Sequence, residues 1–203
     1  IVTLTILNIF STSSLASTLS GTTYIRDKII SSILFVPDKV IKESPSNYGL
    51  KHEDVCIDLE NGNKLYGWYV PAEKKTNKHI IYLHGTKGNI GIYLGGIKEL
   101  HKVGANILIV DYEGFGRSTG KVTISRTIRD SIAMYDYLIK EKNAKPKNIS
   151  LFGYSYGGAL TAELAKRKEV HAILLESTFS SLLEIGTTKH SSLVRFIVSD
   201  NVL

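Results

Sequence analysis

The chain has 203 residues, of which 43% are hydrophobic, enough to bury the core of one domain. Its formal net charge of +6 comes from Lys and Arg residues scattered among Asp and Glu, which indicates a solvated surface and argues against a nucleic-acid partner. The single cysteine, Cys56, excludes an internal disulfide, and we expect it to pack as a small apolar residue.

Residues 1–48 differ in composition from the rest of the chain. The apolar run IVTLTILNIF precedes the small polar stretch STSSLAS, which is the order of an export signal, but no basic residue occurs before Arg26. The run is shorter and more polar than the roughly 20 apolar residues that a membrane span needs. A second apolar patch, IISSILFV, either presses on a membrane surface or folds against the domain. We therefore expect a signal-like or anchoring segment over residues 1–48 and one domain over 49–203. An exported or membrane-associated location stays open beside a cytoplasmic one.

A hairpin is predicted at the start of the domain. The segment EDVCIDLE alternates apolar and polar residues, NGN at 61–63 supplies a turn, and KLYGWYVP returns until Pro71 stops it. We expect these first two strands to pair antiparallel.

Four apolar segments then alternate with amphipathic ones. The apolar segments predict buried strands over 78–85, 105–112, 148–155 and 171–177, and the segments between them predict helices over 92–104, 123–142 and 158–168. Strands with two apolar faces indicate a parallel sheet covered by helices on both sides. The predicted fold class is α/β, with a mostly parallel sheet.

The segment GYSYG at residues 153–157 matches the pattern G-x-S-x-G, and it falls where a buried strand gives way to a helix. A serine on such a sharp turn projects its hydroxyl above the sheet, and the flanking glycines remove Cβ atoms that would collide with the crossing backbone. The helix amino terminus favours the negative charge that develops when the hydroxyl attacks a carbonyl. Ser155 is therefore the candidate nucleophile.

The segment YLHGTKGN ends the first central strand. Hydrolases with a G-x-S-x-G nucleophile turn place the other half of their oxyanion hole at this point. We expect the backbone N–H groups of Thr86 and Tyr156 to converge on the oxyanion of the tetrahedral intermediate. His84 lies in this loop and precedes the serine, so we expect it to hold the loop by hydrogen bonds and not to act as the general base.

Four blocks, YLHGTKGN, DYEGFGRSTG, LFGYSYGG and LLESTFSSL, resemble the α/β hydrolase superfamily in their order and spacing over about residues 55–183. Within it the chain looks like the serine aminopeptidase-like hydrolases, a branch that includes membrane-associated depalmitoylases. The resemblance implies the α/β hydrolase fold and a Ser-His-Asp hydrolase without metal or organic cofactor, acting on a small-molecule or lipid-linked ester, thioester or amide. It also implies structural roles for Asp111, which can cap local N–H groups, and Arg117, which can pair with a carboxylate.

The family order along the chain is nucleophile, acid and then histidine, with the last two on loops after later strands. Because segment 171–177 counts as the sixth of eight strands, we expect an incomplete domain in which the family aspartate and histidine have no matching positions. Glu176 and His190 are conceivable substitutes for acid and base, although Glu176 also fits a structural contact to the nucleophile turn. His171 begins the sixth strand at the opposite end of the sheet and cannot reach Ser155.

Two functions of different classes are left open. The first is a serine hydrolase that is impaired because its acid and histidine are missing. The second is a non-catalytic remnant or binding protein that keeps the pocket above Ser155 without the chemistry. The missing strands would also leave the sixth strand as an apolar sheet edge.

Overall fold

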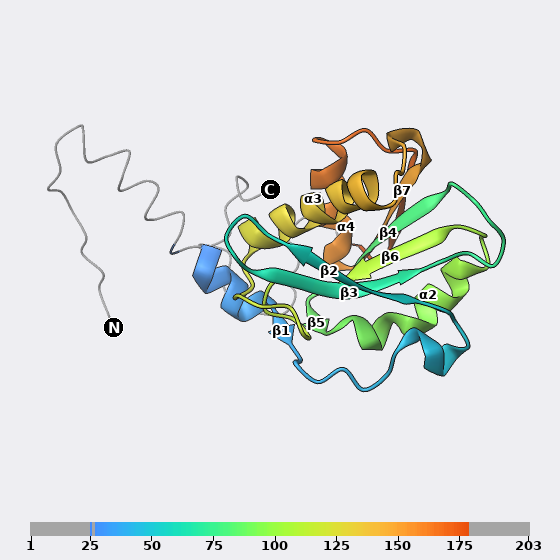
Figure 1. Cartoon of the computed structure of the whole chain (residues 1–203). Helices are drawn as coiled ribbons and strands as arrows, with labels where there is room; N and C mark the ends of the chain where they lie inside the picture. The colour runs from blue at the N-terminus through green and yellow to red at the C-terminus, as the bar shows by residue number, and fades with distance from the viewer. Residues whose placement is uncertain (1–24, 26, 179–203) are drawn as a thin grey trace, which may run out of the picture.

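The computed structural model describes residue 25 and residues 27–178 of the chain (Figure 1). The strands are β1 (Val36–Pro37), β2 (Glu53–Asp58), β3 (Lys64–Val70), β4 (His79–Leu83), β5 (Lys87–Gly88), β6 (Asn106–Val110), β7 (Ile149–Tyr154) and β8 (Ala172–Glu176). Three α-helices follow in the described part of the chain, α2 (Leu94–His101), α3 (Ile124–Glu141) and α4 (Tyr156–Ala165), and the 3-10 helices are η1 (Pro45–Tyr48), η2 (Ile90–Tyr93) and η3 (Pro146–Asn148). Residues 27–34 are also helical.

Six strands form the main sheet in the order β2-β3-β6-β4-β7-β8. β3 pairs antiparallel with both β2 and β6, whereas β4 pairs parallel with β6 and β7, and β7 pairs parallel with β8. The hairpin closes where NGN predicts a turn, since Leu59 N donates to Asn63 O and Gly62 has a φ of 79°. These pairings confirm the mostly parallel α/β sheet with antiparallel first strands.

Helices cover the two faces of the sheet, with α2 on one side and α3 and α4 on the other (Figure 1). β4 shows why the sequence requires this. Its residues Ile80 and Tyr82 join the core cluster that contains α2 residues, and Ile81 and Leu83 join the cluster that contains α3 and α4 residues. A strand with two apolar faces is buried only if both faces are covered.

The helix predicted over 92–104 is shorter than expected. The chain first makes the 3-10 turn η2 and then the α-helix α2, so the apolar spacing does not continue as one helical face. Ile92 and Val103 are accordingly exposed, at 63% and 67%. Gly104 ends the segment as predicted, with a φ of 75° that favours glycine.

The prediction that Cys56 is buried is wrong. β2 alternates as predicted, with Val55 and Ile57 facing the core, so Cys56 between them points to the other face and is exposed. A side chain beside two buried neighbours in a strand lies on the opposite face.

The apolar residues of the sixth strand predict that it is buried, and that prediction is wrong, whereas the alternative expectation of an apolar sheet edge agrees with residues 27–178. Ile173, Leu174 and Leu175 in β8 are 46%, 40% and 55% exposed. Within residues 27–178, β8 is paired on one side only, to β7, so its apolar side chains lack neighbours on the other side.

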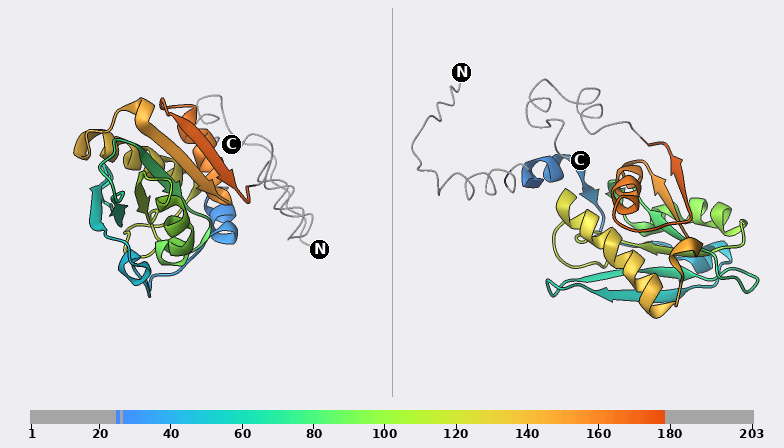
Figure 2. Two further views of the ribbon diagram at one scale, coloured as in Figure 1. Left: turned by 90° about the vertical axis from the view of Figure 1, so that its right-hand side faces the viewer. Right: turned by 90° about the horizontal axis from the view of Figure 1, so that it is seen from above.

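The apolar patch ahead of Pro37 has two different faces. Ile30 and Phe35 are buried in the core cluster beneath α3 and α4, whereas Ile29 and Ile33 are exposed. One face therefore folds against the domain, as one of the two expectations had it (Figure 2). No helix in the part of the chain that the structure describes combines the length and the apolar character of a membrane crossing. The domain boundary expected at residue 48 stays a prediction.

Candidate active site

Ser155 lies on the turn between β7 and α4, directly before the first residue of the helix. Its φ of 53° and ψ of −117° belong to a strained conformation that non-glycine residues rarely adopt. The backbone turns sharply here because Ser155 N donates to Glu176 O at 2.9 Å and Gly158 N donates to Ser155 O at 3.0 Å. The strand, the turn and the helix stand in the order that the G-x-S-x-G pattern requires.

The glycines beside Ser155 permit this turn. A Cβ on Gly157 would overlap the carbonyl oxygen of Leu83 at the end of β4. A Cβ on Gly153 would lie 2.6 Å from Gly157 O, closer than any real side chain approaches. The elbow is therefore pressed against the neighbouring strand, and only glycine fits at both positions.

The loop after β4 lies beside the serine. A Cβ built on Gly85 would be 3.6 Å from Ser155 Cβ, so residues 84–86 border the nucleophile turn. Thr86 is half-buried, and its carbonyl accepts a hydrogen bond from Val36 N at 2.8 Å. Tyr156 is the first residue of α4, whose backbone N–H has no partner inside the helix. The structure thus brings together the two segments that carry the predicted oxyanion donors, Thr86 and Tyr156, and their role as donors stays a prediction.

His84 is fully buried, and its contacts are those of a structural residue. Its Nδ1 donates to Gly85 O at 2.8 Å, its ring stacks on Tyr112 at 3.9 Å, and Tyr112 Oη donates to His84 O. Burial lowers the pKa of His84 to about 4, so the imidazole is neutral near pH 7. These contacts hold the loop, as the sequence predicts for this residue.

Asp111 and Arg117 also make the structural contacts that the resemblance implies. Asp111 Oδ1 accepts a hydrogen bond from Ile90 N at 2.9 Å and so fixes the start of η2. Burial raises the pKa of Asp111 to about 7. Arg117 Nη2 contacts Asp54 Oδ1 at 3.0 Å on the surface.

The proposed substitute acid and base are not brought together within the described residues. Glu176 ends β8 beside the elbow, where its main-chain oxygen accepts from Ser155 N, but its side chain is exposed. His190 lies outside the described residues. His171 donates its backbone N–H to Ile149 O at the start of β7, which is the far end of that strand from Ser155.

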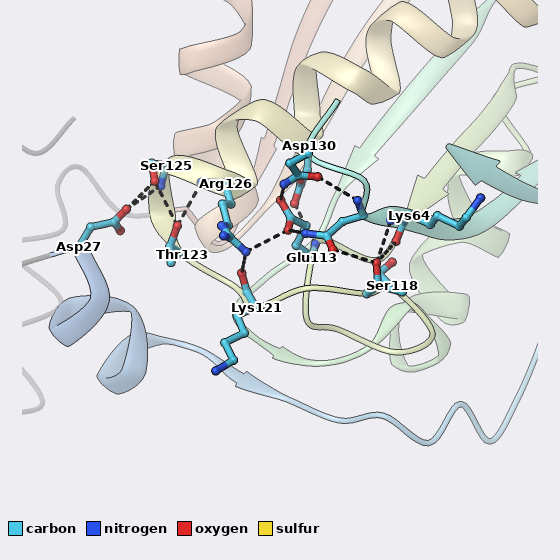
Figure 3. Close-up of polar contacts among 12 residues, drawn as sticks. Asp27, Lys64, Glu113, Ser118, Lys121, Thr123, Ser125, Arg126 and Asp130 are labelled. Atoms are coloured by element: carbon cyan, nitrogen blue, oxygen red, sulfur yellow. Dashed lines mark hydrogen bonds and ion pairs between the residues drawn. The ribbon is translucent and has the colours of Figure 1, made fainter. Parts of the chain in front are cut away.

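Sequence reasoning missed two groups of polar contacts, one at the nucleophile turn and one away from it. Thr178 Oγ1 donates to Ser155 O at 3.0 Å and packs against Gly158, and a threonine two residues past a strand carries no signal for such a contact. The second group surrounds Glu113, whose buried carboxylate accepts from Asn61, Asn63 and Arg126 (Figure 3). This network ties the hairpin turn to α3.

A cavity of about 570 Å³ lies away from the elbow, between β2 and α3. Its lining includes Cys56, Glu113, Arg129 and Tyr137, and none of the predicted site residues is part of it. It is therefore separate from the candidate active site.

A strained serine between a parallel strand and a helix, beside a His-Gly loop at the end of the neighbouring strand, defines the α/β hydrolase class. The serine aminopeptidase S33 family matches residues 74–195, more than half of the chain, and the chain belongs to that family.

Individual proteins agree with this assignment. The chain is 29% identical over 147 residues to the α/β hydrolase domain-containing protein WAV2 of Arabidopsis thaliana, covering 70% of the chain and 48% of WAV2. It is 26% identical to the uncharacterized protein YfhR of Escherichia coli K12, covering 80% and 59%. The esterase Pf2001 of Pyrococcus furiosus superposes with a TM-score of 0.66 at 26% identity, covering 81% of this chain and 66% of the esterase. The chain spans about half the length of the first curated relatives it matches. These similarities support a function of the hydrolase type.

Proposed function

We propose that this protein is a serine hydrolase that transfers an acyl group from an ester, thioester or amide to water, with Ser155 as the nucleophile. The observation that carries the proposal is the strained backbone of Ser155 at the start of α4, in a turn whose Gly157 lies against the end of β4. The Ser155 hydroxyl oxygen would attack the substrate carbonyl and lose its proton, and that proton would leave with the departing alcohol, thiol or amine as the tetrahedral intermediate collapses to an acyl-enzyme. Water would then cleave the acyl-enzyme, releasing the acid and restoring the hydroxyl. The esterase named among the structural neighbours supports the same reaction class.

The N–H groups of Thr86 and Tyr156 are proposed as the oxyanion hole. Two main-chain donors fixed by secondary structure stabilise the developing charge without reorganising during the reaction. Loss of one such donor in a serine hydrolase typically lowers kcat by about 10²–10³-fold. The positive end of the α4 dipole adds to this stabilisation.

The rate of the 203-residue chain is proposed to be impaired. Among the hydrogen bonds of the described residues, none joins Ser155 Oγ to a histidine, and a serine without a base has the reactivity of an ordinary alcohol. Enzymes of this type that lose a triad member keep only about 10³–10⁴-fold acceleration over water. Glu176 and His190 stay as the proposed substitutes, and the alternative proposal is a protein that binds an ester or amide without turning it over.

The experiment compares hydrolysis of p-nitrophenyl acetate, an acyl thioester and a p-nitroanilide by the folded chain and by Ser155→Ala. Hydrolysis above the buffer rate that Ser155→Ala abolishes supports the hydrolase. Absence of such hydrolysis from a folded sample favours the non-catalytic alternative. If Glu176 and His190 act as acid and base, Glu176→Gln and His190→Gln will each reduce the remaining rate by at least about 10²-fold, the size of a general acid-base contribution; unchanged rates remove them from the mechanism.

We also propose that the exposed face of the N-terminal helix binds an anionic lipid surface, which would suit a lipid-linked substrate. Ile25, Ile29 and Ile33 lie four residues apart and are 42–56% exposed, and Val36 continues the apolar surface. The apolar run at residues 1–10 precedes this face, and the net charge of +6, although spread over the surface, gives a long-range attraction to anionic lipid.

Sedimentation with phosphatidylglycerol vesicles tests this docking. Ile29→Glu together with Ile33→Glu should abolish cosedimentation, because the charges would have to enter the apolar layer. Val103→Glu, at a residue 67% exposed on another surface, is the matched control and should bind like the wild type. Equal binding by all variants would contradict the proposed face.

A further inference from the structure

The segment that follows the N-terminal helix runs along residues 84–89, the loop that carries Thr86 and is here called the oxyanion loop. β1 pairs parallel with β5, with Val36 opposite Lys87. Val36 N donates to Thr86 O at 2.8 Å, and Asp38 N donates to Gly88 O at 2.7 Å. Residues 35–38, here called the strap, therefore hold the loop that carries Thr86 through main-chain hydrogen bonds.

A side chain of the loop also donates hydrogen bonds to the N-terminal segment. Asn89, 2% exposed, donates from Nδ2 to Asp38 O at 3.2 Å and to Val40 O at 2.9 Å. The same side chain accepts from Gly91 N and so caps η2. Both ends of the oxyanion loop are thus bonded to this N-terminal segment.

The strap also reaches the other predicted oxyanion donor. Phe35, 5% exposed, places its ring 5.0 Å from the ring of Tyr156 in an edge-to-face contact. Tyr156 is fully buried, and its hydroxyl lies 2.7 Å from Thr127 Oγ1 in α3. Since Tyr156 follows Ser155 directly, packing of its ring by Phe35 and Thr127 limits movement of the first turn of α4.

The strap is itself anchored. Phe35 N donates to Ser31 O at the end of the preceding helix, and Ser31 Oγ accepts from Ile124 N at the start of α3. Asp27, one turn earlier, accepts from Ile124 N and from Ser125 Oγ (Figure 3). The helix over 27–34 is therefore fixed to α3, and this also fixes the first residue of the strap.

We propose that Phe35 and Val36 are positioning residues for the two main-chain oxyanion donors. Val36 fixes the position of the Thr86 N–H, and Phe35 fixes the position of the Tyr156 N–H. This inference rests on the proposed function and adds a specific task for a segment that the sequence assigns to anchoring. Oxyanion donors act over a range of about 2.7–3.1 Å, so a loop that moves by a fraction of an ångström loses much of its effect. Loops at strand ends are otherwise among the more mobile parts of a domain.

The experiment removes one hydrogen bond and measures position and chemistry separately. Val36→Pro deletes the N–H that Thr86 O accepts, and Val36→Ala keeps it while trimming a side chain that is 57% exposed. Amide hydrogen exchange is followed by mass spectrometry in residues 84–90, with β6 as the internal reference. A fluorophosphonate probe that phosphonylates Ser155, releasing fluoride, gives the maximal labelling rate and the probe concentration at half-maximal rate.

In Val36→Pro, hydrogen exchange in residues 84–90 should be at least about 10-fold faster, and exchange in β6 should be unchanged. The maximal labelling rate should fall by about 10-fold or more, with little change in the probe concentration at half-maximal rate. Val36→Ala should match the wild type in all of these. A general loss of stability would instead speed exchange in β6 as well.

Phe35→Leu provides a second test if Val36→Pro does not fold. It keeps an apolar side chain but loses the ring contact to Tyr156, and it should lower the maximal labelling rate and speed exchange in residues 153–158. Unchanged exchange in residues 84–90 of a folded Val36→Pro, or faster exchange with an unchanged labelling rate, overturns the inference. If the wild type itself is not labelled, the proposed function fails, and the exchange results alone then decide whether the strap holds the two loops.

Discussion

At the residue scale, the turn between β7 and α4 depends on two positions with unusual backbone requirements. Ser155 adopts a positive φ, and Gly157 lies against the carbonyl oxygen of Leu83. The strain at Ser155 is maintained by the surrounding hydrogen bonds to Glu176 and Gly158.

Gly157→Ala should destabilise the fold strongly, because its Cβ would overlap the backbone of β4, which cannot move without disturbing the sheet. We expect a loss at or above the upper end of the usual overpacking cost of about 1–3 kcal/mol. Gly95→Ala is the matched control: a Cβ there meets nothing within 4 Å in α2, and the substitution should be neutral or stabilising by up to about 1 kcal/mol. Urea denaturation measures both, and equal stability of the two variants would contradict the close approach at Gly157.

The strand-to-helix position of Ser155 could be predicted from sequence because a local pattern carries it. The two glycines and the apolar lead-in lie within a few residues of the serine. Contacts between distant segments could not be predicted in this way, and Val36 with Thr86 and Asn61 with Glu113 are examples. Such pairs depend on how the loops meet in three dimensions, which no local period encodes.

A buried carboxyl group gives the protein a pH-dependent stability. Asp130 Oδ2 accepts from Glu113 N, and its Oδ1 is buried without a hydrogen-bond partner. Burial, with a smaller contribution from the Glu113 carboxylate, raises the pKa of Asp130 to about 8, against the lowering effects of the Glu113 N–H, Arg129 and Arg126. The folded protein therefore keeps a proton between about pH 4 and pH 8 that the unfolded chain releases, so this group's contribution to stability is present at low pH and is lost as the pH rises through that range.

Asp130→Asn removes this titration and keeps the acceptor oxygen. The drop in unfolding free energy between pH 5 and pH 8 should be smaller than in the wild type by up to about 4 kcal/mol. Urea titrations at the two pH values measure it, and Asp58→Asn, at an exposed side chain, should behave like the wild type. An unchanged drop in Asp130→Asn would show that Asp130 does not carry the effect.

At the element scale, the N-terminal helix and α3 are joined end to side. Thr123 is the N-cap residue of α3, and its side chain accepts a hydrogen bond from Arg126 N. Asp27, which lies in the N-terminal helix, accepts a second hydrogen bond at this end of α3, from Ile124 N (Figure 3). A carboxylate at a helix amino terminus pairs with free N–H groups and with the positive end of the helix dipole. The sequence predicted α3 from its apolar stripe, but its second cap comes from nearly one hundred residues away and has no local signature.

Asp27→Ala should lower the unfolding free energy by about 1 kcal/mol, the usual cost of losing a helix cap. Asp58→Ala removes a carboxylate of the same kind from an exposed pair with Lys64, and such pairs contribute about 0–1 kcal/mol. Thermal or urea unfolding of both variants gives the comparison. A loss for Asp27→Ala no greater than for Asp58→Ala would contradict the capping role.

At the scale of the whole molecule, the sheet is covered unevenly. The mostly parallel sheet and both covering layers could be predicted, because two-faced apolar strands alternating with amphipathic helices leave few topologies. Apolar composition alone predicts β8 as a buried strand, because composition does not show whether a neighbouring strand lies beside it, and only the expected loss of later strands predicts its exposure. Within residues 27–178 the free side of β8 presents main-chain groups and leucine side chains.

An open apolar edge promotes pairing between copies. Sedimentation velocity of the 203-residue chain should show association that increases with concentration, and Leu175→Lys, at a residue 55% exposed, should reduce it. Val103→Lys places the same charge on another exposed position and should not. Association that is the same in all three proteins would show that the edge is not the contact.

The proposed function depends on Ser155 acting as a nucleophile on the turn between β7 and α4. Peptide mapping after reaction with a fluorophosphonate probe tests it most directly. One adduct should form slowly on Ser155, and none should form in Ser155→Ala. A folded protein that forms no adduct, or forms it on another residue and still does so in Ser155→Ala, would contradict the claim.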